Sequence, residues 1–150
     1  MTNEMKPTIM RPQLTKEEHD PIFAEIYANR DKRAAERPRI EEEGEAALHR
    51  LFKVAKGDSG QCRHIARFLL GLYNGNRFPF DLTRLRSIDA ELFDDCIAVL
   101  KMDAAPRQEV HRYFDGGGKA FEALVTSWNV LDMVKLQQAA RDAGIDVQQD

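Results

Sequence analysis

Two cysteines and two histidines are the side chains whose chemistry could bind a metal or attack a substrate. Cys62, His64, Cys96 and His111 are ligand types that zinc accepts, but no tight Cys-x2–4-Cys or His-x3–5-His pair is present. Cys62 and His64 are two apart on an expected helix and point roughly 200° apart. A Cys–His nucleophile pair stays open, although no orienting group or oxyanion donor accompanies it. We expect no metal, no cofactor and no catalytic residue, and leave open whether His64 or His111 joins a site.

Two glycine-containing motifs resemble catalytic segments and fail on their context. The segment "GDSGQ" is similar to the nucleophile segment of trypsin-like proteases, which works on a β-barrel scaffold. Here it lies between two expected helices, so we interpret Gly57 as a left-handed C-cap and Ser59 as an N-cap. The triple glycine 116–118 lacks the signature and the preceding strand of a phosphate loop. We interpret it as a flexible joint between helices.

The arginines offer the most informative chemistry. From Gln61 to Arg86, five arginines stand against one acidic residue, Asp81, a local charge of +4, whereas residues 87–103 carry a local charge of −4. Neighbouring elements of opposite sign often neutralise one another, which is one interpretation. The other is a basic groove with aromatic neighbours that contacts nucleic-acid phosphates or an acidic protein. The candidate contact residues are Arg63, Arg67, Arg77, Arg84 and Arg86.

Helices must position these side chains, because apolar residues recur at helical spacing and no period-2 run of β-branched residues occurs. We expect an all-α fold, a compact single-domain bundle of five to seven helices. Thr15 and Glu18 form a capping-box pattern that begins a charged helix, which Pro38 should kink or end. The following helix, about 39–56, presents a core stripe that comprises Ile40, Ala47, Leu48, Leu51, Phe52 and Ala55. A short helix beginning at Pro106 should end at the triple glycine.

The predicted organisation has four parts. Residues 1–14 are expected to be a disordered tail, 15–37 the charged N-terminal helix, 38–145 the helical domain, and 146–150 a disordered C-terminus. The charged helix is expected to project as an interaction arm or to form a homodimer.

The segment "NGNRFPFD", residues 74–81, predicts a corner between two helices. In extended backbone alternate residues share a face, so Phe78 and Phe80 should both enter the core while Arg77 and Asp81 face outward. Asp81 should cap the short turn that begins at Leu82.

Composition excludes several classes of protein. The chain has 150 residues, 43% hydrophobic and 31% charged, with a net charge of −3, which are globular values and give no global case for polyanion binding. No window is apolar enough to span a membrane, and the first residues lack the apolar core of a signal peptide. We expect a cytoplasmic protein with reduced cysteines.

The strings "LYNGNRFPFDL", "LFDDCIAVLKMD" and "EVHRYF" resemble a family of small uncharacterised proteobacterial proteins, a domain of unknown function, over roughly residues 45–128. The resemblance implies a bacterial cytoplasmic setting and an association with plasmids, phages and integrative elements. It carries over no catalytic residue and no ligand.

We therefore expect a non-enzymatic accessory protein that binds and modulates another macromolecule, with a protein as the first choice of partner. The alternative is a nucleic-acid-associated protein that uses the arginines around the corner. An enzyme with no recognisable motif is the third hypothesis.

Overall fold

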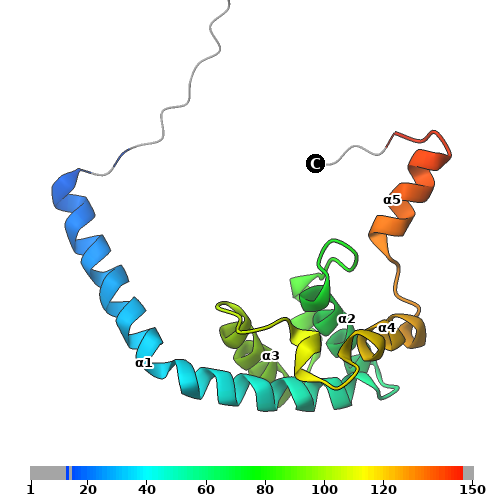
Figure 1. The fold of residues 1–150 in the computed structure, drawn as a ribbon, viewed down its shortest axis with the longest axis horizontal. Coiled ribbons are helices and arrows are strands. Elements are labelled where there is room, and N and C mark those ends of the chain that lie inside the picture. Colours follow the sequence, from blue (N-terminus) through cyan, green and yellow to red (C-terminus); the bar gives the residue numbers. More distant parts are fainter. Residues whose placement is uncertain (1–12, 14, 147–150) are drawn as a thin grey trace, which may run out of the picture. The chain divides into compact units, whose positions relative to one another are not determined.

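The computed structural model describes Gln13 and residues 15–146, and the regular elements of that part of the chain are helical throughout. The described chain forms five α-helices, which Figure 1 labels, and two short 3-10 helices, one before and one after α3. Their bounds are α1 Lys16–Ala55, α2 Gly60–Tyr73, η1 Leu82–Ser87, α3 Ala90–Asp103, η2 Val110–Tyr113, α4 Gly117–Trp128 and α5 Met133–Asp142. The predicted all-α fold class is confirmed. The predicted tails, 1–14 and 146–150, lie almost wholly outside the described residues.

The chain divides into two units, residues 1–37 and 38–150, and α1 contributes residues to both. The start of α1 is capped as predicted. The backbone N–H of Thr15 donates to Glu18 Oε2 over 3.0 Å, and the N–H of Glu18 donates to Thr15 Oγ1 over 3.3 Å. No helix of the described residues is long and apolar enough to cross a membrane.

Of the two outcomes predicted at Pro38, a kink or an end of the helix, the end is wrong, because α1 continues through this residue to Ala55. Proline in a helix interior removes one backbone hydrogen bond and crowds the preceding turn. The flanking alanine, arginine and glutamate residues are strong helix formers that offset this cost. Arg39 also donates to Glu43, one turn later, over 2.8 Å. The two helices expected from the sequence are therefore one.

The core of the second unit is built on the C-terminal part of α1. The predicted stripe is confirmed, with Ala47, Leu48, Leu51 and Ala55 fully buried and Phe52 nearly so. The core residues from the other elements are Ile65, Ala66, Phe68, Leu69, Leu70, Phe78, Cys96, Val99, Met102, Val110, Phe121 and Leu124. Burial of these side chains is the main force that holds the unit together.

Two sequence interpretations between α1 and α2 have different outcomes. Ser59 is the N-cap of α2, as predicted, and its Oγ accepts from the N–H of Cys62 over 3.3 Å. Gly57 is not a left-handed C-cap, because among the described glycines only Gly116 and Gly144 have positive φ. A Cβ at Gly57 would lie 2.6 Å from the Sγ of Cys62. Glycine is needed there for close approach and not for its backbone conformation.

The triple glycine also has a role other than the predicted flexible joint. Gly116 has φ 59° and precedes α4, whereas Gly117 is buried in the first turn of that helix. A Cβ at Gly117 would lie only 1.6 Å from the backbone oxygen of His111 in η2. The helix predicted to begin at Pro106 is the four-residue η2, and the glycine seats α4 directly on it.

Candidate functional site

A group of basic side chains on α2 and η1 is the candidate functional site. Arg63, His64 and Arg67 lie within about one helical turn on α2. Arg84 comes from η1. We call these four residues the basic cluster. Arg63 and Arg67 are four residues apart, so they share a face of the helix, and His64 lies beside them.

The corner before η1 places Arg84 against α2. Phe78 is buried, and Phe80 packs edge-on against Phe68 of α2 with ring centroids 5.6 Å apart, which confirms that both rings enter the core. A Cβ on Gly71 would meet Phe80 Cβ at 3.0 Å, so glycine permits this approach. Asp81 caps η1 as predicted, because its Oδ1 accepts from the N–H of Thr83 over 2.9 Å.

His64 is the centre of the basic cluster. Nη1 of Arg84 lies 3.5 Å from His64 Nδ1, and because a guanidinium can only donate, a hydrogen bond between them requires Nδ1 to be the acceptor. Burial, together with the charges of Arg84, Arg63 and Arg67, lowers the pKa of His64. Burial and the charges of Arg84 and Arg63 likewise lower the pKa of Arg67. Burial is the larger cause of both shifts, and the neighbouring positive charges add to it.

The basic cluster lacks the carboxylates that usually accompany half-buried arginines such as Arg67 and Arg84. Within the described residues, no carboxylate lies within ion-pair distance of Arg63, Arg67 or Arg84. The Nε of Arg67 is buried and has no hydrogen-bond partner in this part of the chain. Asp81 is within electrostatic reach of Arg84, and its single negative charge is shared between Arg84 and Arg86. The positive charge therefore remains largely uncompensated.

The interpretation that residues 61–86 and 87–103 neutralise one another is not supported by these contacts. Asp95 of α3 is taken by Arg50 of α1, in a bidentate pair with distances of 2.8 and 3.0 Å. Asp89 exchanges two hydrogen bonds with Gln61, over 2.6 and 3.0 Å, and not with an arginine. Asp95 and Asp89 are thus bound to partners outside the five predicted arginines.

Arg77, one of the five predicted contact residues, belongs to a different arrangement. Its Nε donates to Asp132 over 2.7 Å, and its two terminal nitrogens donate to the carboxylate of Glu122 in α4. We call Arg77, Glu122 and Asp132 the arginine clamp. The prediction that Arg77 faces outward is wrong, since its side chain is only 20% exposed.

The clamp ties three elements to one another. The backbone oxygen of Arg77 accepts from the N–H of Met133 over 2.9 Å, and the Tyr73 hydroxyl donates to Glu122 over 3.0 Å. The hydrogen bonds from Arg77 lower the pKa of Glu122, and they also lower that of Asp132 against the opposing effect of burial. These carboxylates are ionised and neutralise the guanidinium, so Arg77 is structural.

The arginines predicted as one site are therefore divided. Arg63, Arg67 and Arg84 come together around His64, Arg77 lies in the clamp, and Arg86 is exposed on η1 within electrostatic reach of Asp81. His64 was left open by sequence reasoning and is the addition that the structure makes. The sequence signal for His64 was its position between Arg63 and Arg67 on one helix. The site also needs Arg84 from η1, and the sequence does not show that η1 lies beside α2.

The remaining thiol and imidazole groups do not share this site. Burial raises the pKa of the Cys96 thiol to about 12, and Cys62 lies in the first turn of α2 beside Ser59. The ring of His111 packs edge-on against Tyr73, with centroids 5.2 Å apart. Over the described residues, no three His, Cys, Asp or Glu side chains gather in an arrangement that could hold a metal ion.

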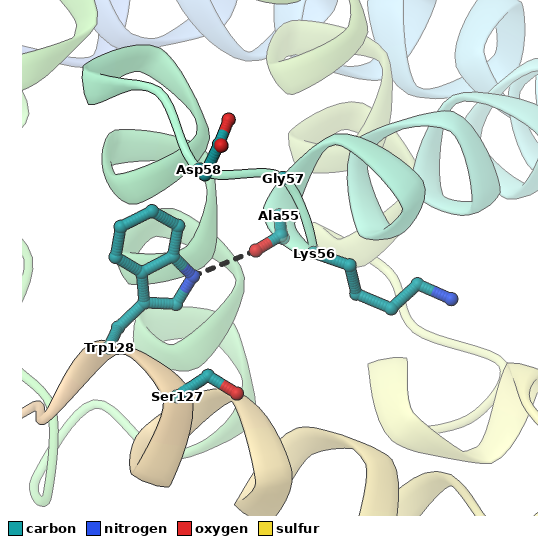
Figure 2. A pocket seen from close by; sticks show the side chains of 6 residues that line it. All are labelled: Ala55, Lys56, Gly57, Asp58, Ser127 and Trp128. Atoms are coloured by element: carbon teal, nitrogen blue, oxygen red, sulfur yellow. Dashed lines mark hydrogen bonds between the residues drawn. The ribbon is translucent and has the colours of Figure 1, made fainter.

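A shallow hollow of about 450 Å³ lies where the end of α1 meets the end of α4. Figure 2 shows the Trp128 indole in it, with Nε1 donating to the backbone oxygen of Ala55 over 2.8 Å. The charged ends of Lys56 and Asp58 point away from one another and from the indole (Figure 2). The Trp128 N–H and the Ala55 carbonyl oxygen thus satisfy each other, and this hydrogen bond connects the end of α4 to the end of α1.

A comparison with known protein families identifies the family of this chain. Residues 45–129, more than half of it, match the family of unknown function DUF7673. The chain belongs to this family. The basic cluster lies within the matched residues, as does Glu122 of the clamp, whereas Asp132 and most of α1 lie outside them. No curated protein and no solved structure matches the chain.

Proposed function

We propose that this DUF7673 protein is a non-enzymatic binding protein whose basic cluster engages an acidic surface of another protein. The observation that carries the proposal is the set of uncompensated cations around His64, with the Arg67 Nε left without a hydrogen-bond partner among the described residues. Buried donors are normally satisfied, so the Arg67 guanidinium is not held in a structural ion pair of the kind that Arg77 makes. Arginine suits this task because its planar fork binds a carboxylate through two hydrogen bonds.

A protein is favoured over a nucleic acid by the size and surroundings of the cluster. Its charge is gathered around one imidazole, whereas a nucleic acid presents a phosphate every few ångströms and is usually met by a basic track. Arg77, which would extend the track, is neutralised by Glu122 and Asp132. The chain as a whole carries −3, which opposes association with a polyanion. A local group of carboxylates on a protein matches the cluster better.

The cellular setting is the part of the proposal that rests on sequence resemblance. The strings around "LYNGNRFPFDL" resemble proteobacterial proteins associated with plasmids, phages and integrative elements. We therefore infer an accessory protein of a mobile element that acts in the bacterial cytoplasm. Modulation of a host or element protein fits a small chain whose proposed site contains arginine and histidine but no nucleophile.

Affinity capture with matched charge variants tests the proposal. The full-length protein is immobilised and exposed to bacterial lysate, beside Arg67→Gln with Arg84→Gln and a control, Arg112→Gln with Arg141→Gln. Both double variants lose the same charge, but Arg112 and Arg141 are exposed and lie outside the cluster. We expect captured acidic proteins to fall about tenfold or more with the cluster variant and to persist with the control.

Two results would contradict the proposal. Equal recovery by the cluster variant and the control would show that the cluster does not bind the captured proteins. Recovery that disappears after nuclease treatment and falls steeply with salt would favour the nucleic-acid alternative instead.

A further inference from the structure

The N-terminal part of α1 carries a stripe of large apolar side chains that are exposed to solvent. Ile22, Phe23, Ile26 and Tyr27 are exposed by 43%, 36%, 51% and 54%. Their spacing places them on one face of the helix, where side chains three and four apart are neighbours. We call these four residues the apolar stripe.

The apolar stripe is organised by its own contacts. The rings of His19 and Phe23 stack with centroids 3.8 Å apart, and Phe23 meets Tyr27 at 6.2 Å. Residues 15–36 are exposed throughout. An isolated helix of this length is marginal in water, because most helical stability in proteins comes from packing of an apolar face. A partner that covers the stripe would supply that packing.

The charges on either side of the stripe indicate which partner. Before it, residues 16–21 hold Glu17, Glu18 and Asp20 against Lys16, a net charge of −2. After it, residues 30–37 hold four basic side chains against Asp31 and Glu36, a net charge of +2. One end of the segment is therefore the electrostatic complement of the other.

We propose that residues 16–37 pair with the same segment of a second copy of this chain, in antiparallel orientation. A two-fold axis between Ala24 and Glu25 puts the stripe of one copy against the stripe of the other. The same axis sets the end with net charge −2 in each copy opposite the end with net charge +2 in the other. Parallel pairing would instead bring ends of like charge together, which is unfavourable.

The inference goes beyond the proposed binding function and uses none of its residues. A dimer would carry two basic clusters in one particle, which raises the effective concentration for a partner with repeated acidic groups. Substitutions in the cluster should leave dimerisation intact, so the two proposals succeed or fail separately.

Sedimentation equilibrium of the full-length protein over a broad concentration range tests the stripe. We expect a reversible monomer–dimer equilibrium, loss of the dimer in Ile26→Asp, and an unchanged dimer in Leu131→Asp. Leu131 is a suitable control because it is equally apolar, 68% exposed and outside the segment. A wild-type chain that is monomeric at every concentration would overturn the proposal, as would a dimer that survives Ile26→Asp.

Charge reversal tests the orientation. Glu17→Lys with Asp20→Lys should weaken the dimer, and so should Arg30→Glu with Lys32→Glu. All four substitutions in one chain should restore it, since each end then meets its complement again. A four-substitution chain that is helical by circular dichroism but monomeric would contradict the antiparallel arrangement.

Discussion

The arginine clamp and the basic cluster are built from the same residue type within one stretch of sequence, yet they have opposite surroundings. Arg77 in the clamp meets Glu122 and Asp132, which raise its pKa through hydrogen bonds. Arg67 in the cluster meets Arg84 and Arg63, and its pKa is lowered by burial and by their charges. Local charge density alone therefore does not identify a site. The position of carboxylates far along the chain decides which arginine is held in an ion pair and which is not.

The largest expected loss of stability comes from a substitution at the contact between α4, which carries Glu122 of the clamp, and η2. Gly117→Ala should destabilise the protein by about 3 kcal/mol, because a Cβ would lie 1.6 Å from the His111 oxygen and the backbones must separate. Gly118→Ala is the matched control, since a Cβ there meets nothing within 4 Å and alanine favours the helix. Chemical denaturation of both variants measures the difference. Equal stabilities would show that α4 is not seated on η2 as described.

The next effect compares the two arginine environments directly. Arg77→Met should lower the free energy of unfolding by about 1–3 kcal/mol, because it leaves Glu122 and the mostly buried Asp132 without their partner. Arg67→Met keeps the length of the side chain and removes repulsion, so its effect should stay within about 0.5 kcal/mol. Urea titrations at neutral pH provide both values. A cost for Arg67→Met as large as that for Arg77→Met would remove the distinction between clamp and cluster.

The sequence predicts the local features of both arginine environments but not the contacts between distant residues, and the reason is physical. The capping box at Thr15 and the corner at Phe78 and Phe80 follow from local rules, and the structure bears them out. The fate of Arg77 depends on Glu122 and Asp132, which lie 45 and 55 residues away, and no local pattern reports such contacts. Periodicity and cap patterns describe single elements, whereas the site arises where two elements meet.

Two further differences have the same origin. Gly117 is required by the approach of η2 and not by its own backbone angles, so its sequence neighbours do not predict its role. Pro38 is tolerated because helix-forming neighbours outweigh one missing hydrogen bond. In both cases the residue's own conformational preference was outweighed by its surroundings: by the contact with η2 at Gly117, and by the helix-forming neighbours at Pro38.

A smaller change in stability is expected at acidic pH, where the carboxylates of the clamp become protonated. The pKa values of Glu122 and Asp132 lie below their ordinary values of 4.5 and 3.8 in the folded protein. The clamp therefore contributes its full stability above those ordinary values and loses it as the pH falls through the folded-state values. The difference in unfolding free energy between the wild type and Arg77→Met should shrink below about pH 4, by roughly 1 kcal/mol. A difference that stays constant down to the acid transition would show that the carboxylates are not charged partners of Arg77.

The central claim, that the basic cluster is a binding site for carboxylates, is tested most directly by an NMR titration with a glutamate-rich peptide at low salt. We expect saturable shifts of the backbone amides around Arg63–Arg67 and Leu82–Arg86. These shifts should persist in Arg77→Met and disappear in Arg67→Gln with Arg84→Gln. Shifts centred on another part of the chain, or shifts that survive loss of both cluster arginines, would contradict it.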